Sequence, residues 1–189
     1  MSYQSEQLLE RARDIDLVVF DVDGVLTDGG LYYGAGGEQL KRFDVKDGHG
    51  LVLAHVAGLR TAILTGRHSP AVDVRAAELW MSPVIQGCKD KRAGLAKLLA
   101  DAQTPPTRVA FVGDDLNDLP AMAGVRLAAC PSDAVTDVRE RSHFVARAAG
   151  GFGAVREILE FILRTQGKWA TAVMTTATPP PSIAGVWHG

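Results

Sequence analysis

The sequence is poor in the features that mark secreted and membrane-spanning proteins. Its 189 residues include only two cysteines, Cys88 and Cys130, and these do not have the spacing of a metal site. We expect them to be reduced thiols in the core of a cytoplasmic protein. No apolar run approaches the roughly 20 residues that a membrane span needs. The first residues, MSYQSEQLLERARDIDLVV, carry charge before any apolar run, which is unlike a signal peptide.

An excess of charge of one sign is also lacking. The net charge is −2, which argues against a broad surface for nucleic acid. The composition therefore predicts a protein that binds neither nucleic acid nor a membrane. The 47% share of apolar residues is enough for a complete core, and a length of 189 residues suits one domain.

The most informative stretch is LVVFDVDGVLT, residues 17–27. A short, β-branched apolar run of this kind predicts a buried strand of a parallel sheet. Side chains alternate along a strand, so Asp21 and Asp23 would share one face while the strand continues. Gly24 would then end the strand and let the backbone approach a ligand. Two such carboxylates can hold a hard divalent cation, act as nucleophile and general acid/base, or be solvated acids in a turn.

The rest of the chain alternates between strand and helix patterns. Periodicity and capping residues predict helices at 5–14, from Asp47 to about 56, after Ser69 with Pro70 at the first position, and at 89–101, 116–123, 133–139 and 154–163. Strands are predicted up to Asp21, twice within 29–43 around a glycine-rich turn at 34–37, and at 59–64, 84–85, 108–112, 125–129 and 143–145.

This order predicts an α/β fold, a Rossmann-like parallel sheet with helices on both faces. One domain would span residues 1–167, with the 29–43 hairpin inserted after the first strand. After Gly167 the chain is rich in Thr, Pro and Ala and lacks periodicity, so we expect residues 168–189 to be a flexible tail.

Polar residues stand near the ends of four predicted strands, and these ends converge on one edge of a parallel sheet. They are Asp21 and Asp23, Thr65, Lys91 at the start of the helix after 84–85, and Asp114, Asp115 and Asp118. Singly, each could be a turn residue, a solvated lysine or an acid at a helix start. Together they offer acids for Mg²⁺, a hydroxyl and a cation, a set that suits phosphoryl transfer.

The motifs DVDGVLTDGG, LTGR and GDDLND, with the position of Lys91, resemble the four motifs of the haloacid dehalogenase superfamily of phosphatases. The resemblance implies an Mg²⁺-dependent phosphatase that forms an aspartyl-phosphate. By the same resemblance Asp21 is the nucleophile, Asp23 the general acid/base, Thr65 and Lys91 hold phosphoryl oxygens, Asp21, the carbonyl of Asp23 and Asp114 bind Mg²⁺, and Asp115 and Asp118 orient the metal shell.

Longer segments are similar to one capless branch of that superfamily, the 3-deoxy-D-manno-octulosonate 8-phosphate phosphatases. The segments are LTDGGLYY, GEQLKRF, KDGHGL, QGCKDK and GGFGAVREI, and the similarity runs from about residue 16 to 166. It implies hydrolysis of a sugar acid phosphate in lipopolysaccharide precursor synthesis, by a homotetramer built on the hairpin. Gly66, Arg67 and Arg75 would bind substrate, because an arginine fork suits the sugar carboxylate.

Other functions remain open on the sequence alone. A relative in the same branch acts on a nine-carbon sugar acid phosphate, but it has glutamate after Thr-Gly and lysine at the position of Glu78, where this chain has Arg67 after Gly66. A signalling receiver domain also combines a phospho-accepting Asp with a Thr and a Lys. It is disfavoured because the Asp-x-Asp unit comes first here and GDDLND last. A non-catalytic subunit is disfavoured because all the expected catalytic residues are present.

Overall fold

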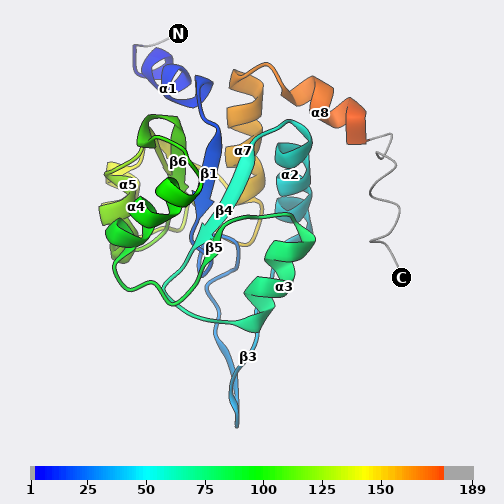
Figure 1. The fold of residues 1–189 in the computed structure, drawn as a ribbon, viewed down its shortest axis with the longest axis vertical. Helices are drawn as coiled ribbons and strands as arrows, with labels where there is room; N and C mark the ends of the chain where they lie inside the picture. Colours follow the sequence, from blue (N-terminus) through cyan, green and yellow to red (C-terminus); the bar gives the residue numbers. More distant parts are fainter. Residues whose placement is uncertain (1–2, 177–189) are drawn as a thin grey trace.

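A six-stranded parallel sheet forms the centre of the molecule (Figure 1). The computed structural model describes residues 3–176. The strand order is β5-β4-β1-β6-β7-β8, so β1 lies between β4 and β6. These strands are β1 (Leu17–Phe20), β4 (Arg60–Leu64), β5 (Val84–Ile85), β6 (Val109–Val112), β7 (Leu127–Cys130) and β8 (Phe144–Val145). The expected α/β fold is confirmed.

Apolar side chains alternate between two cores, one on each face of the sheet. Val18 and Phe20 of β1 belong to one cluster, whereas Leu17 and Val19 belong to the other. All four are fully buried, which explains why the strand is a continuous apolar run. The two layers of side chains therefore require helices on both faces.

Helices cover both faces. The first cluster includes residues of α2 and α7, and the second includes residues of α4 and α6. No helix of the described residues is long and apolar enough to cross a membrane. The helices are α1 (Tyr3–Arg13), α2 (Val45–Val56), α3 (Pro70–Glu78), α4 (Lys91–Asp101), α5 (Leu119–Met122), α6 (Thr136–Arg141), α7 (Ala154–Thr165) and α8 (Trp169–Thr176), with short 3₁₀ turns at Pro106–Arg108 and Leu116–Asp118.

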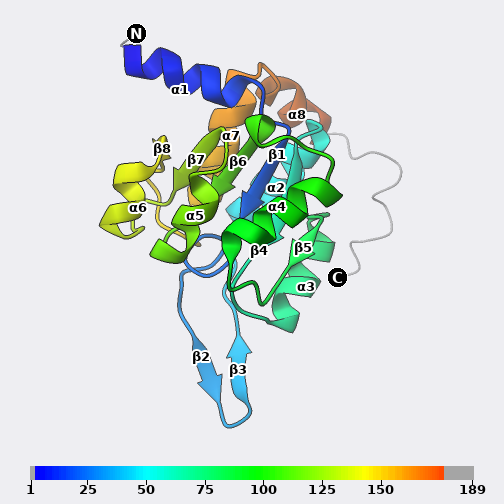
Figure 2. The same ribbon diagram turned by 60° about the vertical axis from the view of Figure 1, so that its left-hand side comes forward.

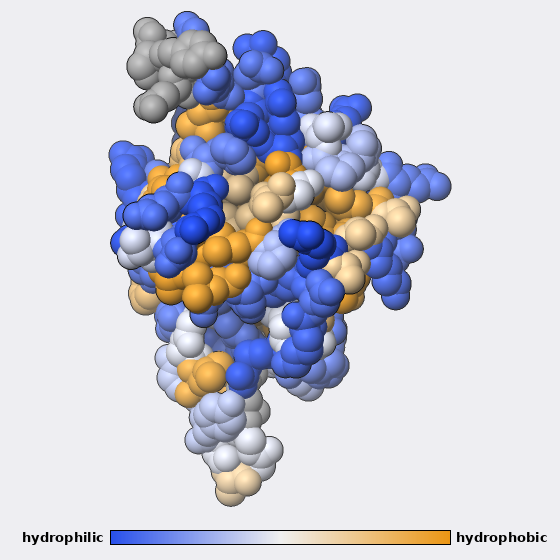
Figure 3. Space-filling view, turned by 90° about the vertical axis from the view of Figure 1, so that its left-hand side faces the viewer, coloured by the Kyte–Doolittle hydropathy of each residue, from blue (hydrophilic) through white to orange (hydrophobic). Residues whose placement is uncertain are grey.

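The predicted hairpin is present and projects from the body of the molecule (Figure 2). It consists of β2 (Tyr32–Gly34) and β3 (Gly37–Leu40), which pair antiparallel, and a bridge between Thr27 and Phe43 closes its root. Figure 3 shows the hairpin as a narrow lobe. An isolated two-stranded ribbon of this kind is marginal in water, so its contacts to the body at the root matter for its orientation.

Asp47 does not cap its own helix, contrary to the prediction. The N-cap of α2 is Asp44, whose side chain accepts hydrogen bonds from the backbone N–H groups of Lys46 and Asp47. The Asp47 carboxylate instead accepts from the N–H groups of Gly153 and Arg156 at 3.1 and 2.7 Å. It therefore caps α7, a helix that begins more than a hundred residues later, and so ties two neighbouring helices together.

The expected flexible tail is also corrected in its first part. Residues 169–176 form α8, where Ala172 is buried and Trp169 packs on the core. The guanidinium groups of Arg156 and Arg164 of α7 lie 4.9 and 5.0 Å from the Trp169 ring. A run of small and threonine residues has weak helix periodicity, so tertiary contacts decide its structure. The remainder of the predicted tail, 177–189, lies outside the described residues.

Candidate active site

The carboxyl ends of β1, β4 and β6 meet around one pocket of about 240 Å³. This is the edge of a parallel sheet where ligands of α/β proteins bind. Most of the residues predicted for the site line it, and Asn117, which the sequence analysis did not single out, joins them. The lining residues are Asp21, Asp23, Gly29, Thr65, Gly66, Arg67, Asp114, Asp115 and Asn117.

Asp21 lies deepest among the acids of this pocket. The sequence predicted that strand alternation would place Asp21 and Asp23 on one face. In the structure β1 ends at Phe20 and the chain turns after Asp21, so the turn brings the two side chains to the same pocket. Asp21 is only 5% exposed, and its Oδ2 atom lies 2.9 Å from the ammonium of Lys91. Its Oδ1 atom is buried and has no partner among the described residues. Lys91 thus orients the carboxylate through one oxygen and leaves the other without a hydrogen bond.

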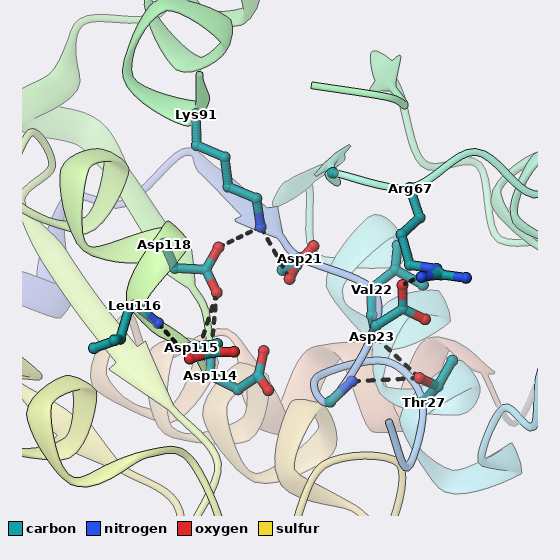
Figure 4. Close-up of polar contacts among 12 residues, drawn as sticks. Asp21, Val22, Asp23, Thr27, Arg67, Lys91, Asp114, Asp115, Leu116 and Asp118 are labelled. Carbon is teal, nitrogen blue, oxygen red and sulfur yellow. Dashed lines mark hydrogen bonds and ion pairs between the residues drawn. The ribbon is translucent and has the colours of Figure 1, made fainter. Parts of the chain in front are cut away.

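Lys91, the first residue of α4, is held between two acids (Figure 4). Its ammonium contacts Asp21 and also Asp118, which is fully buried. Burial lowers the pKa of Lys91, but attraction by Asp21 and Asp118 outweighs it and the net pKa is raised. Lys91 therefore stays charged beside the pocket.

Asp118 also accepts backbone hydrogen bonds in the loop after β6. Its Oδ2 atom accepts hydrogen bonds from the N–H groups of Asp114 and Asp115 at 3.0 and 3.3 Å. The Asp115 side chain accepts from the N–H of Leu116 at 2.7 Å. The prediction that Asp115 and Asp118 orient a metal shell stays a prediction, and the contact between Asp118 and Lys91 was not predicted.

Asp114 faces the backbone of the turn after β1. Gly24 has φ of +84°, and a Cβ atom there would lie 2.0 Å from Oδ2 of Asp114, so only glycine fits. Burial, with repulsion from Asp21, Asp118 and Asp115, raises the pKa of Asp114 to about 8. Burial and repulsion from Asp118 likewise raise the pKa of Asp21 to about 6, against the opposing effect of Lys91.

These acids suit a divalent cation. Asp21, Asp114 and Asp118 each place a carboxylate oxygen within 4.8 Å of the others. Because Asp118 already binds Lys91 and two N–H groups, Asp21 and Asp114 are better placed to bind a ligand, and the buried Oδ1 atom of each has no partner among the described residues. The carbonyl of Asp23 precedes Gly24, whose backbone lies against Asp114. Carboxylate and carbonyl oxygens are what Mg²⁺ prefers.

Two hairpin side chains reach this site, which the sequence analysis did not foresee. Lys41 follows β3 and donates to Oδ1 of Asp23, while Nε of Arg67 lies 3.8 Å from Oδ2 of the same carboxylate. Arg67 in turn donates to the hydroxyl of Tyr33 at 2.7 Å. The members of each pair are distant in the sequence, so only the folded chain shows that they meet.

Arg75 is not brought to the pocket. Its guanidinium pairs with Glu78 at 2.8 Å and lies 5.9 Å from the ring of Phe43, beside the N-terminal end of α2. The side chain extends from α3 to α2, where a Cβ atom at Gly48 would lie only 2.2 Å from its Nη2 atom. Within one chain, therefore, the structure groups Gly66 and Arg67 with the acids and leaves Arg75 apart.

The parallel sheet and the acidic pocket at its edge are those expected of a haloacid dehalogenase-like phosphatase, and comparison with known proteins agrees with this class. A family model described as haloacid dehalogenase-like hydrolase matches residues 41–126. A 3-deoxy-D-manno-octulosonate 8-phosphate phosphatase (KdsC) of Yersinia pestis is 41% identical over 164 residues, 87% of this chain and 88% of that protein. The protein of the same name from Escherichia coli strain K12 is 42% identical, with 87% of each chain covered.

Solved structures are similar over the same region. The crystal structure of the Yersinia pestis phosphatase superposes with a TM-score of 0.85 at 41% identity, covering 87% of this chain and 89% of that one. A Moraxella catarrhalis phosphatase of the same name, crystallised with magnesium ion, phosphate ion and KDO, gives a TM-score of 0.87 at 36% identity, covering 90% and 98%. The chain belongs to the haloacid dehalogenase-like hydrolases, and within them to the 3-deoxy-D-manno-octulosonate 8-phosphate phosphatase family.

Proposed function

We propose that the protein hydrolyses 3-deoxy-D-manno-octulosonate 8-phosphate to 3-deoxy-D-manno-octulosonate and phosphate, with Mg²⁺, in lipopolysaccharide precursor synthesis in the cytoplasm. The observation that carries the proposal is the carboxylate of Asp21. It follows β1 and lines the pocket, with one oxygen held by Lys91 and the other buried without a partner among the described residues. A desolvated, fixed carboxylate is suited to attack a phosphorus atom.

In the first step an oxygen of Asp21 attacks phosphorus, and the bond from phosphorus to the ester oxygen breaks. Asp23, whose side chain also lines the pocket, gives its proton to that leaving oxygen. In the second step Asp23 takes a proton from water, and the water oxygen attacks the aspartyl-phosphate. Phosphate leaves and the Asp21 carboxylate is restored.

Lys91 and the end of β4 would hold the phosphoryl group during both steps. Thr65 is 2% exposed and lines the pocket beside Gly66, so its hydroxyl can donate to a phosphoryl oxygen. Lys91 brings a positive charge against the reacting carboxylate. Such fixed donors and charges stabilise the developing negative charge of phosphoryl transfer.

Mg²⁺ would be held by Asp21, Asp114 and the carbonyl of Asp23. The fit rests on the two buried Oδ1 atoms, which have no partners within the described residues, and on the raised pKa values of Asp21 and Asp114, which burial and repulsion from neighbouring carboxylates cause. When bound, the cation supplies positive charge that offsets the charge of the phosphoryl group. The Moraxella catarrhalis relative crystallised with magnesium supports the choice of metal.

The sugar acid would face Arg67. Arg67 lines the pocket with its Nε atom 3.8 Å from Asp23, and there its guanidinium can form a fork with the substrate carboxylate. The alternative is a nonulosonate 9-phosphate, which differs in chain length and shares the carboxylate. The relatives named above favour the eight-carbon substrate.

The proposal is tested by phosphate release from a panel of sugar acid phosphates, with and without EDTA. We expect the octulosonate 8-phosphate to have the highest kcat/KM, and EDTA to remove activity. Asp21→Asn should fold and bind substrate but lose turnover, because an amide is a poor nucleophile. Full activity in EDTA, or substantial turnover by pure Asp21→Asn, would contradict the metal or the nucleophile respectively.

We also propose that four copies assemble through the hairpin. The hairpin exposes large apolar side chains, with Leu40 65%, Tyr32 45% and Leu31 43% exposed in the single chain. A ribbon with unpaired edges and apolar side chains is a surface that proteins normally cover. Sedimentation of the purified protein at several concentrations measures the number of copies directly.

A further inference from the structure

A lysine with a buried side chain connects the hairpin to the acid that we propose as the proton donor. Lys41 is the residue after β3, and its side chain is only 2% exposed. Its ammonium donates to Oδ1 of Asp23. A lysine is rarely buried unless it is paired, so this contact is a specific feature of the hairpin root and has no counterpart in the four superfamily motifs described above.

The Asp23 carboxylate is held on both sides. Oδ1 faces Lys41, and Oδ2 lies 3.8 Å from Nε of Arg67, as Figure 4 shows for the Arg67 side. The longer second distance makes Lys41 the tighter of the two partners. The contact at Oδ1 favours one rotamer of Asp23 and leaves Oδ2 as the oxygen that can carry the proton, so the rotamer defines the direction in which the proton is delivered.

Thr27 holds the backbone of the turn that carries Asp23. The Thr27 hydroxyl accepts from the N–H of Gly24 at 3.4 Å and donates to the carbonyl of Val22 at 3.3 Å. Thr27 also bridges to Phe43 at the hairpin root. The same root thus positions the turn through Thr27 and the side chain through Lys41.

We infer that Lys41 is a positioning residue for Asp23, and that the hairpin of each chain is therefore part of that chain's own active site. The inference rests on the proposed function, in which Asp23 protonates the leaving oxygen. Lys41 acts through Asp23 and does not itself contact the reacting atoms. Without it the carboxyl group would turn about its side-chain bonds, and proton transfer to the leaving oxygen would suffer most.

Two aryl esters of nearly equal size separate this role from a general structural one. Phenolate is a poorer leaving group than p-nitrophenolate, so phenyl phosphate needs the proton from Asp23 more than p-nitrophenyl phosphate does. For Lys41→Met we expect kcat on phenyl phosphate to fall about 10–100-fold, within the range for a misplaced acid, and kcat on p-nitrophenyl phosphate to fall about threefold or less. KM should change little for either ester.

Controls tie the result to the Asp23 contact. Lys46→Met removes an exposed lysine of α2 and should leave both esters unchanged. Lys41→Arg, which keeps a donor for Asp23, should restore part of the difference. Thermal stabilisation by Mg²⁺ and the sedimentation coefficient should match the wild type in all variants. If Lys41→Met does not fold, the same ratio is measured for Lys41→Gln.

The inference is overturned if the two esters lose activity equally, or if Lys41→Met retains wild-type kcat on phenyl phosphate. Failure of the proposed function would look different. In that case the wild-type protein itself would not hydrolyse the esters or the sugar acid phosphate, before any variant is compared.

Discussion

The pKa of Asp114 is raised further from its usual value than that of Asp21. Burial and neighbouring carboxylates raise it to about 8, and its Oδ1 atom has no partner in the described part of the chain. The residue is therefore costly for the metal-free fold and useful only with a cation. Function and stability oppose each other at this position.

Asp114→Asn should reveal this opposition. Without metal at pH 8, the variant should unfold with a free energy roughly 1–3 kcal/mol higher than the wild type, because a desolvated charge is removed. The wild type should gain about 2.7 kcal/mol when Mg²⁺ is a hundredfold above its Kd, whereas the variant should gain little. Denaturant unfolding in EDTA and in Mg²⁺ measures both effects, and a variant that Mg²⁺ stabilises like the wild type would exclude Asp114 as a ligand.

The pH dependence of the same comparison has a definite sign. The pKa of an unperturbed aspartate is 3.8 and that of Asp114 in the fold is about 8, so the folded state keeps a proton that the unfolded state has lost. The free energy of unfolding of the metal-free wild type therefore falls, relative to Asp114→Asn, as pH rises from about 4 to 8. Unfolding in EDTA at a series of pH values between these limits tests it, and a constant difference would contradict it.

At the scale of the element, Asp47 shows how one carboxylate joins two helices. It caps α7 from the first turn of α2, and burial raises its pKa although the N–H groups of Arg156 and Gly153 lower it. The glycine loop before α7, residues 150–153, packs closely against the turn after β1. A Cβ atom at Gly150 would lie 1.8 Å from the carbonyl oxygen of Gly24. The cap therefore supports the loop beneath the site.

Asp47→Ala should lower the free energy of unfolding by roughly 1–3 kcal/mol, since it leaves two N–H groups without their acceptor. Asp101→Ala, at the exposed end of α4, is the matched control and should change it by less than about 0.5 kcal/mol. Urea unfolding at neutral pH measures both. Equal effects of the two substitutions would mean that the cap of α7 contributes nothing.

Tyr33 is the hairpin residue that contacts Arg67. Tyr33→Phe removes the hydroxyl that accepts from Nη2 of Arg67, so the guanidinium should become less ordered. We expect KM for the sugar acid phosphate to rise about fivefold, the equivalent of one hydrogen bond, with KM for p-nitrophenyl phosphate unchanged. Tyr32→Phe is the control on the same strand. An unchanged KM for the sugar substrate in Tyr33→Phe would remove Tyr33 from substrate binding.

At the scale of the whole molecule, the projecting hairpin is the feature that a single chain leaves exposed. Tyr32→Asp combined with Leu40→Asp should yield smaller species than the wild type, because charges would enter the apolar contact between copies. Activity on the sugar acid phosphate should fall more than activity on p-nitrophenyl phosphate, since Asp21, Thr65, Lys91 and the other proposed catalytic residues come from one chain. Analytical sedimentation and the two assays test this.

Val74→Asp is the control, because Val74 is 71% exposed on α3 and lies outside the hairpin. It should not change the sedimentation coefficient. If the wild-type protein is a fully active monomer, the proposed assembly is wrong, while the assignments within the pocket are unaffected.

Much of the fold was predictable from local patterns. The apolar runs at β1 and β6 are buried on both faces, so they have no polar residues and are easily recognised. The chemistry of the pocket was predictable for a related reason. Parallel strands place their carboxyl ends at one edge, so the acids after β1 and β6 and the threonine after β4 were expected at that edge, and the observed strand order makes them neighbours.

The sequence by itself thus determined the class of fold, the pocket edge and the family, because each depends on local patterns and motifs. Tertiary structure alone decided which charges meet. Asp47 bonds to α7 rather than to its own helix, Lys41 pairs with Asp23, and Arg75 turns away from the pocket. These partners are distant in sequence, or lie on elements whose relative orientation is not encoded in any short pattern. A charged side chain takes the partner that packing brings within reach, and packing is a property of the whole chain.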